Sequence, residues 1–583
     1  MFQIKNGKQY RDETSRKISW GHWFAFFNIL WAIAIGSRYA FIIDWPHTLS
    51  GKLYFFISLF GHFSFIIFAI YLLLIFPLSF VVKNHRTFRG ISVILATIGC
   101  TLLLVDTEVF SRFHLHLSSV VWNLLVNPEK GELSRTWQIF FAPMPIILLA
   151  QMLFSRWSWE KLRSLERQRW LKFVGVFFVC AFTATHLVYA WSDAFIYRPI
   201  TMQKSNFPLS YPMTARSFLE SHGFLDKNQY SRTLEQEGRL DALKVDYPQH
   251  ELVFAKSAVK PNIVLVTVSG LRYDSISVEK MPKLTALAEH STQYLNHYST
   301  GNQDNNGLTG IFYGLNANYT ESLLTNQTPS VLIERLSDKA TNYQIGVFSD
   351  NGFKPSLFRQ SIFSQHKLSR KKKTSATTVD DFLQWHSTMA LQNKAYFGYL
   401  DLHIEEGLNP TGYALALNKL DDLLSKLWQQ VDSENTLLIL TAAKGYYFDE
   451  LNERQYRSYF AKDIIQVPMI VRWHALPIGK IEKLTSHTDL LPALMTHVFN
   501  VQNPVSDYAQ GTDLFDLNGN RSWVLAGNYR WNVIITTDGT QYHLDRHGNY
   551  QKYDRTYEKQ SSNSPPLGLF LDVFNQHGMF FEK

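Results

Sequence analysis

The stretch NIVLVTVSG, residues 262–270, is the clearest structural signal in the chain. It is a short run of branched aliphatic residues between Pro261 and Gly270, which is typical of a strand buried on both faces. Similar runs follow at residues 344–349, 396–401, 436–441 and 467–473. Helical patterns lie between them at residues 283–290, 329–339 and 413–430. This alternation predicts an α/β domain with a largely parallel sheet flanked by helices.

Polar residues follow the predicted strands at one edge of this sheet. Ser269 follows the first strand, predicted at residues 262–268, Asp350 follows the second, and residues 402–406 and 442–445 follow the next two. Because the carboxyl ends of parallel strands meet at one edge, we expect a functional site there. The tail of the chain differs, since residues 523–553 hold two short strand pairs around the turns Asp538-Gly539 and His547-Gly548. They predict a small C-terminal antiparallel subsheet.

The first third of the chain is much more apolar than the rest. Five stretches are long and apolar enough to cross a bilayer as helices: residues 20–43, 53–82, 90–110, 137–154 and 170–191. The leading tail and the alternate connections carry fourteen Lys and Arg residues, whereas the intervening connections carry four. The positive-inside rule therefore predicts a cytoplasmic N-terminus and a C-terminal domain beyond the inner membrane, in the bacterial periplasm.

Composition limits the functional classes further. The chain has 583 residues, of which 46% are hydrophobic and 18% charged, which excludes both a disordered protein and one compact domain. The net charge of +8 comes largely from loops between spans, so nucleic acid is not expected as a partner. Cys100 and Cys180 both lie in predicted spans, and the outer part must be stable without disulfides. We expect a transmembrane domain at 1–191, a periplasmic linker at 192–260 and the α/β domain at 261–583.

Five motifs in the α/β region resemble the alkaline phosphatase and sulfatase superfamily. They are NIVLVTVSGLRYD at 262–274, MPKLTALAEHSTQYLNHYSTGNQDNNGLTGIFYGL at 281–315, LLILTAAKG at 437–445, QVPMIVRW at 466–473 and HTDLLPALM at 487–495. The resemblance implies the fold of that superfamily. Its enzymes hold divalent metals with an Asp after the first strand, an Asp-His pair after a late strand and further His, and they attack with Ser, Thr or Cys.

This chain departs from the superfamily at those positions. Ser269 stands at the first Asp position, and Ala443 and Lys444 replace the Asp-His pair. Gln303 stands at the nucleophile position and Lys462 where related enzymes carry His. Neither Ala nor Lys ligates a divalent cation under normal conditions, and the Gln303 amide has no useful nucleophilicity. The sequence therefore predicts a degenerate, non-catalytic sulfatase-like domain without a metal or other cofactor, in which Lys444 either holds an anion or is simply solvated.

A closer resemblance covers almost the entire chain. The stretches SWGHWFAFFNILWAIAIGSRYAFIIDWP at 19–46, GHFSFIIFAIYLLLIFPLSF at 61–80, RFHLHL at 112–117 and YRPITMQKSNFPLSYPMTARSFLESHGFLD at 197–226 resemble the YejM family, also called PbgA or LapC. The resemblance implies an inner-membrane sensor that binds lipopolysaccharide through lipid A and supports outer-membrane homeostasis. It implies a LapB-type adaptor as partner, which otherwise promotes degradation of LpxC by FtsH, and cardiolipin as a further lipid.

The resemblance also implies a lipid A site in the linker, where backbone N-H groups and arginines meet a phosphate. Thr214, Ala215 and Arg216 stand in the matching places, at the start of a helix expected near residues 214–222. Ser217 departs from the pattern, because a second arginine is expected there. A hydroxyl lacks the charge and the bidentate reach of a guanidinium, so lipid affinity or headgroup preference is expected to differ.

Two other functions remain open from the sequence. One is a metal-dependent phosphatase or phospholipid headgroup transferase, which requires Asp274, Asp304, Asp350 and His403 to converge with a hydroxyl. The other is a structural tether for a periplasmic or outer-membrane partner. A basic run at residues 367–373 is either a solvated loop or a contact for anionic headgroups.

Overall fold

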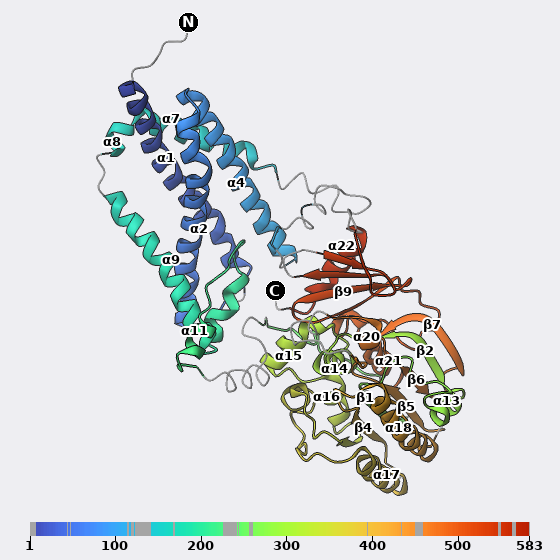
Figure 1. Ribbon diagram of the computed structural model, residues 1–583. Coiled ribbons are helices and arrows are strands. Elements are labelled where there is room, and N and C mark those ends of the chain that lie inside the picture. The colour runs from blue at the N-terminus through green and yellow to red at the C-terminus, as the bar shows by residue number, and fades with distance from the viewer. Residues whose placement is uncertain are drawn as a thin grey trace.

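The computed structural model describes residues 7–43, 45–46, 48–113, 116–117, 122, 141–166, 170–225, 242, 244–255, 260–392, 394–432, 434–448, 459–545, 550–561 and 567–581. Figure 1 shows a bundle of long helices from the first part of the chain and an α/β domain from the second. The last helix of the bundle, α9, ends at Ala194, and the first strand of the α/β domain, β1, begins at Asn262. The division at residues 192–260 stays a prediction.

Five long helices and two short ones, α3 and α8, form the bundle in the described part of the chain. They are α1 Gly7–Gly36, α2 Leu49–Ile70, α3 Phe76–Val81, α4 His85–Phe113, α7 Met144–Glu160, α8 Leu162–Glu166 and α9 Trp170–Ala194. Within the described residues, four helical stretches are long and apolar enough to cross a membrane: Tyr10–Phe41, Leu49–Val81, His85–Ser111 and Trp170–Ala194. The predicted span at 137–154 falls on α7, but residues 137–140 lie outside the described part. Five crossings therefore stay a prediction.

Buried polar contacts hold the first helices of the bundle together. In the middle of the bundle, Gln151 Nε2 of α7 donates to Asn28 Oδ1 of α1 at 2.6 Å. At the N-terminal end, Lys17 Nζ donates to the backbone oxygens of Ser79 and Val82 at 2.5 and 2.9 Å, at the end of α3. The interior of a bilayer offers no water to polar groups, so buried polar groups form hydrogen bonds with one another. These contacts fix how the helices pack.

The linker after α9 is mostly short helical turns. It contains α10 Arg198–Thr201, the 3₁₀ turn η3 Met202–Ser205 and α11 Arg216–Ser221. The helix expected near residues 214–222 is present as α11, with Ala215 at its N-cap position. Pro208 and Pro212 lie between η3 and α11 and prevent a continuous helix there, whereas Pro199 lies in the first turn of α10, where proline is tolerated.

A seven-stranded sheet forms the centre of the α/β domain. Its strands are β1 Asn262–Ser269, β2 Thr292–Tyr298, β3 Gln344–Ser349, β4 Tyr396–His403, β5 Thr436–Thr441, β6 Met469–Arg472 and β7 Gly479–Ser486, in the order β3-β4-β1-β5-β6-β2-β7. Strands β3, β4, β1 and β5 are parallel, whereas β6 is antiparallel to both neighbours. The predicted largely parallel sheet is therefore confirmed, with one reversed strand. Strands β2 and β7 were not among the predicted ones.

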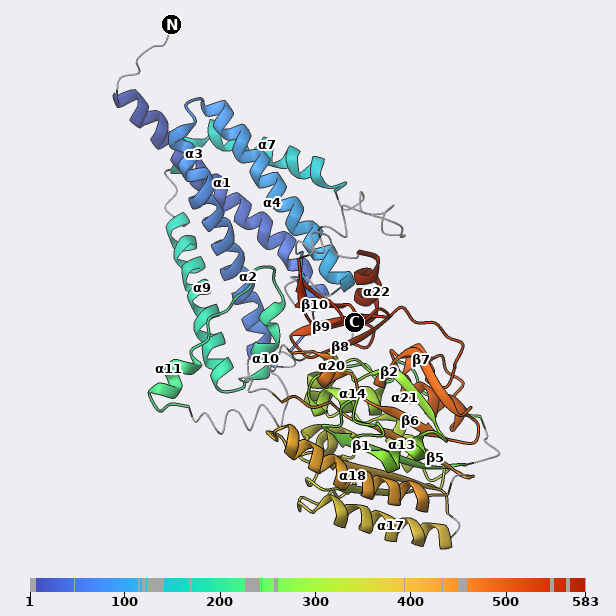
Figure 2. The ribbon, with the colours of Figure 1, turned by 45° about the vertical axis from the view of Figure 1, so that its right-hand side comes forward.

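Helices cover both faces of this sheet (Figure 2). One layer contains α13 Pro282–Ala288, α17 Ser375–Leu391 and α18 Pro410–Gln430, and the other α14 Asp304–Tyr313, α15 Thr320–Asn326, α16 Val331–Ser337 and α21 Leu490–His497. Strand β1 serves both layers, because Ile263 and Leu265 pack into one core while Val264 and Val266 pack into the other. This burial explains why the strand is a continuous apolar run.

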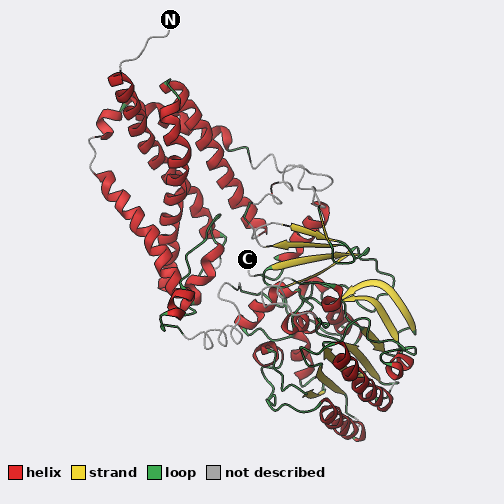
Figure 3. Cartoon of the chain, viewed as in Figure 1, coloured by secondary structure: helices red, strands yellow, loops and turns green. Residues whose placement is uncertain are grey.

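A second, five-stranded antiparallel sheet follows near the C-terminus (Figure 3). It consists of β8 Trp523–Gly527, β9 Trp531–Thr536, β10 Gln541–Asp545, β11 Tyr550–Tyr553 and β12 Lys559–Gln560. The predicted turn at His547-Gly548 lies outside the described residues. Helix α22 Leu567–His577 follows this sheet and contacts α4, so the end of the chain returns to the helical bundle.

Candidate functional site

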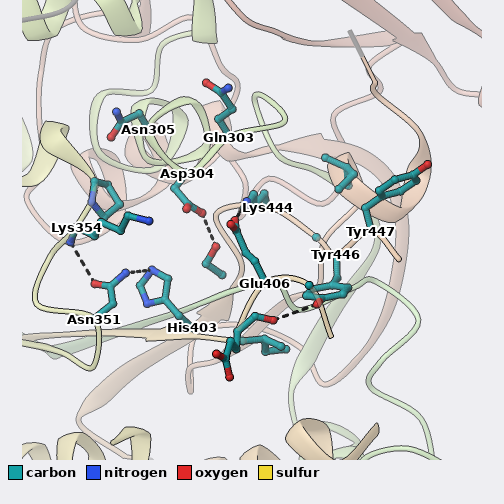
Figure 4. A pocket seen from close by; sticks show the side chains of 18 of the residues that line it. Gln303, Asp304, Asn305, Asn351, Lys354, His403, Glu406, Lys444, Tyr446 and Tyr447 are labelled. Atoms are coloured by element: carbon teal, nitrogen blue, oxygen red, sulfur yellow. Dashed lines mark hydrogen bonds and ion pairs between the residues drawn. The ribbon is translucent and has the colours of Figure 1, made fainter. Parts of the chain in front are cut away.

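A pocket of about 1740 Å³ opens at the carboxyl edge of the seven-stranded sheet, where the sequence predicts a site (Figure 4). Ser269 at the end of β1, Asp350 after β3, His403 at the end of β4 and Lys444 after β5 all line it. The register of the parallel strands explains this convergence, since Ser269 pairs directly with His403. These four strands therefore bring the predicted edge residues to one cavity.

Backbone hydrogen bonds fix the loops that form the floor of this pocket. Gly270 N-H donates to Lys444 O at 3.0 Å, and Ile404 N-H donates to Ser269 O at 2.9 Å. Gly445 N-H donates to Ile464 O at 2.7 Å, at the end of α20 Lys462–Ile465. The lining side chains are therefore carried by loops that are bonded to one another.

The start of α14 supplies a carboxylate but no hydroxyl to the pocket. Gln303 occupies the N-cap position of α14 and lines the pocket, and Asp304 follows it. The Ser269 hydroxyl donates to Asp304 Oδ1. Thr300 is fully buried and donates to Asn306 O, so it does not face the cavity. The residue at the predicted nucleophile position is thus an amide, as the sequence indicates.

Two carboxylates and an amide gather around the imidazole of His403 on the opposite side of the pocket. His403 Nδ1 lies 3.0 Å from Asp350 Oδ1, and its Nε2 lies 3.7 Å from Asp401 Oδ1 and 2.7 Å from Asn351 Nδ2. Burial raises the pKa of Asp401 to about 7. Burial opposes the charge on the ring, but the carboxylates of Asp401 and Asp350 outweigh it and raise the pKa of His403 to about 9.

These shifts predict that the protein loses stability as the pH rises from about 6.5 to 9. Since the pKa of His403 is higher in the folded than in the unfolded chain, its contribution is complete below 6.5 and is lost as the pH passes about 9. The shift corresponds to about 3 kcal/mol. Thermal unfolding of the full chain at a series of pH values should show this decrease of stability with rising pH, and His403→Gln should make the decrease smaller. Replacement of the exposed His290 serves as control. If His403→Gln showed the same dependence of stability on pH as the wild type, a raised pKa of His403 would be contradicted.

Lysines surround the remaining side of the pocket. Lys444 Nζ donates to Glu406 Oε1 at 2.8 Å, and its charge lowers the pKa of Glu406. Lys354, Lys372 and Lys373 also line the cavity, so part of the basic run 367–373 belongs to the pocket. The sequence did not predict this placement or the Lys444–Glu406 pair, because both depend on how loops from different strands fold over the edge of the sheet.

The side chains at the superfamily's metal positions do not fit a divalent cation. Lys444 lines the pocket and its ammonium pairs with Glu406, and Ala443 is buried with its carbonyl accepting from Ser299 Oγ. Asp274 pairs with Arg272 and Lys280, and neither it nor Lys462 is among the lining residues. Among the described residues, no three His, Cys, Asp or Glu side chains are arranged to hold a metal ion. We derive no metal-dependent step from this site.

The residues predicted to contact lipid lie beside the end of α9. Arg216 Nε, at the start of α11, forms an ion pair with Asp193 Oδ2 at 2.7 Å, and its side chain remains 42% exposed. Met213 N-H donates to His186 Nδ1 of α9 at 3.0 Å. Thr214 is exposed and Ala215 half-buried, and Ser217 lies within α11. The ion pair with Asp193 was not predicted from the sequence.

Family models match two separate parts of the chain. A domain of unknown function (DUF3413) matches residues 7–254, and the Sulfatase model matches residues 386–501. Among solved structures, a protein in the alkaline phosphatase superfamily from Vibrio parahaemolyticus is similar, with 13% identity and a TM-score of 0.45. That similarity covers 62% of this chain and 98% of the other.

Two curated relatives match over nearly their whole length. An uncharacterized protein from Haemophilus influenzae is 62% identical over 99% of this chain and 98% of its own. The inner membrane protein YejM of Salmonella typhimurium is 40% identical over 99% of both chains. This chain therefore belongs to the family of the inner membrane protein YejM and contains a sulfatase-like α/β domain.

Proposed function

We propose that this protein is an inner-membrane sensor of lipopolysaccharide that regulates lipopolysaccharide synthesis through the LapB, FtsH and LpxC proteolysis pathway. Its α/β domain then lies in the periplasm and is non-catalytic. Membership of the YejM family and the charge asymmetry of the loops support this assignment. The amide of Gln303 and the ammonium of Lys444 in the pocket support the loss of ester hydrolysis.

The main support for lipid binding is the linker around Arg216, which combines a cation with exposed apolar side chains. Its exposed large hydrophobic residues are Leu209, Tyr211, Met213, Phe218 and Phe224. Such side chains are unfavourable in water and favourable at the edge of a bilayer. A half-exposed guanidinium among them suits an amphiphile with an acidic headgroup, and the phosphates of lipid A fit that description.

The linker is also attached to the helix that would transmit the signal. Arg216 and Met213 both contact α9, through Asp193 and His186 respectively. A lipid that competes with Asp193 for the guanidinium would change the contact between α11 and α9. Binding then favours one of two arrangements of the linker on the helix, which is what a sensor requires.

Lipid A binding by the purified full-length protein tests this proposal. Arg216→Ala removes a charge-assisted hydrogen bond and should weaken binding roughly tenfold. Ser217→Arg supplies the arginine that the family pattern expects and should strengthen binding. Lys204→Ala, in the nearby η3 turn, is the matched control and should leave binding unchanged. Equal binding by Arg216→Ala and the wild type would refute the site.

A measurement in cells tests the regulatory part. The abundance of LpxC is followed by immunoblot in a strain that lacks the native gene and expresses either the wild type or Arg216→Ala. If lipid binding relieves inhibition of the adaptor, cells with Arg216→Ala retain more LpxC than wild-type cells when lipopolysaccharide accumulates. No difference would leave the protein outside this pathway even if it binds lipid A.

A further inference from the structure

Cations converge on the indole of Trp159 at the end of the helical bundle that carries the N-terminus (Figure 1). The Arg16 guanidinium of α1 lies 4.6 Å from the ring centroid, and that of Arg89 in α4 lies 4.9 Å from it. The His85 ring stacks on the same indole at 5.1 Å with an interplanar angle of 3°. Three helices, α1, α4 and α7, therefore contribute to one group, which we call the Trp159 cluster: Arg16, His85, Arg86, Arg89 and Trp159.

The positive charge of the Trp159 cluster is only partly offset, because three arginines face two carboxylates within electrostatic range, those of Glu13 and Glu160. Arg89, Arg86 and Arg16 all lie within electrostatic range of His85, and Glu13 opposes them. In the part of the chain that the structure describes, none of these three arginines forms an ion pair with a carboxylate. Glu160, at the end of α7, pairs instead with the exposed Arg156 at 3.0 Å.

Arg89 in particular has a donor that none of the described residues accepts. Its Nη1 donates to the backbone oxygen of Ser155 at 3.2 Å, but its buried Nε has no hydrogen-bond partner in the described part of the chain. A buried donor without a partner is unfavourable, so an acceptor that enters the cluster is favoured. The nearby buried Lys17 is not part of this site, because its ammonium donates to backbone oxygens at the end of α3.

We propose that the Trp159 cluster binds the phosphate of an anionic phospholipid. A guanidinium presents paired donors that match phosphate oxygens, and the indole holds the guanidinium planes in place. The cluster lies at the ends of candidate spans, at the depth where headgroups lie, and exposed Trp157 and Trp170 lie at the same end of the bundle. This site is separate from the linker site, since α11 lies at the opposite end of the bundle (Figure 1).

Surface charge alone does not explain this arrangement. Lys161 and Arg163 lie exposed at the same end of the bundle and are typical basic residues of a membrane boundary. In the Trp159 cluster, by contrast, two guanidinium groups face one aromatic ring and one of their nitrogen atoms is buried. The cluster therefore selects a phosphate at a defined position, whereas exposed lysines attract anionic lipid diffusely.

Native mass spectrometry of the full-length protein tests the proposal. The protein is released from nanodiscs of phosphatidylcholine mixed with phosphatidylglycerol, and retained phosphatidylglycerol is counted. Arg16→Gln should reduce its retention roughly fivefold, which corresponds to the loss of one cation near the headgroups. Arg16 is exposed and carries no hydrogen bond of the helix packing, so this variant should fold. Arg89→Gln also changes the contact with Ser155 and is a second, less conservative variant.

Two controls separate the possible results. Arg163→Gln, in α8 at the same end, should retain phosphatidylglycerol like the wild type, and so should Arg216→Ala in the linker. Unchanged retention by Arg16→Gln, or an equal loss in Arg163→Gln, would overturn the proposal. Inorganic phosphate is tested with protein in phosphatidylcholine alone, and phosphate binding that depends on Arg16 there would overturn the assignment to a lipid. Failure of this test leaves the lipid A measurement with Arg216→Ala unaffected.

Discussion

Gly307→Ala is expected to prevent stable folding of the α/β domain. Gly307 lies in the first turns of α14, where this helix passes over the loop after β5. A Cβ atom at this position would lie 1.9 Å from the carbonyl oxygen of Ala443 and 2.7 Å from its carbonyl carbon. Both atoms belong to the backbone, so no side chain can rotate away. Overpacking a core costs about 1–3 kcal/mol and sometimes more, and this clash belongs at the upper end or above it.

The clash also disturbs the pocket, because α14 and the loop after β5 carry Gln303, Asp304 and Lys444. Thermal unfolding and limited proteolysis of the full-length protein measure the loss of stability. Gly568→Ala in α22 is the matched control, since it makes the same change in a helix with nothing within 4 Å. Alanine is favoured over glycine in a helix by roughly 0.5–1 kcal/mol, so the control should be neutral or slightly stabilised. A Gly307→Ala variant as stable as the wild type would mean that α14 does not pack on this loop.

The sequence predicts the central strands well and the edges of the sheet poorly. Strands β3 and β5 have the predicted bounds, because a strand between two helical layers is apolar throughout. Strand β7 lies at the edge and alternates exposed charges, Lys480 and Glu482, with half-buried residues, so it lacks a continuous apolar run. Helix α14 was missed for another reason. It begins in the segment GNQDNNG, whose glycine and asparagine residues are typical of a turn.

The position of the pocket could be predicted from the sequence, but the hydrogen bonds and ion pairs between its side chains could not. Ser269, Gln303 and Lys444 all line the cavity, because strand ends and a helix start meet at one edge of a parallel sheet. The partners of these residues depend on side-chain packing between distant segments. Lys444 bonds Glu406, and Asp401 approaches His403 from within β4 itself. Spacing along the chain carries no signal for such pairs, since it does not give the direction in which a side chain points.

Buried Asp106 of α4 connects the helical bundle to the linker and is the second position where a large effect is expected. Asp106 is 3% exposed and accepts hydrogen bonds from the Tyr39 hydroxyl and from the backbone N-H of Leu117. Its Oδ2 also lies 2.7 Å from His116 Nδ1, and the other ring nitrogen, Nε2, lies 2.8 Å from the backbone oxygen of Ser205 in the linker. One carboxylate of α4 thus organises groups from the 3₁₀ turn Ser37–Phe41 that follows α1, from residues 116–117 after α4 and from η3.

Asp106→Ala is expected to destabilise the protein by about 3–5 kcal/mol. The substitution leaves the Tyr39 hydroxyl and the Leu117 N-H without an acceptor in an apolar surrounding, and it removes the partner of His116. Thermal unfolding in detergent measures the loss. Glu108→Gln is the matched control, because Glu108 pairs with Arg38 at a half-exposed site where an ion pair contributes at most about 1 kcal/mol. Faster amide hydrogen exchange at residues 205–210 should accompany the Asp106→Ala loss, since His116 then no longer holds Ser205. Normal exchange there would show that the linker is held by His62, whose ring lies 2.8 Å from Pro208 O, rather than by the Asp106–His116 pair.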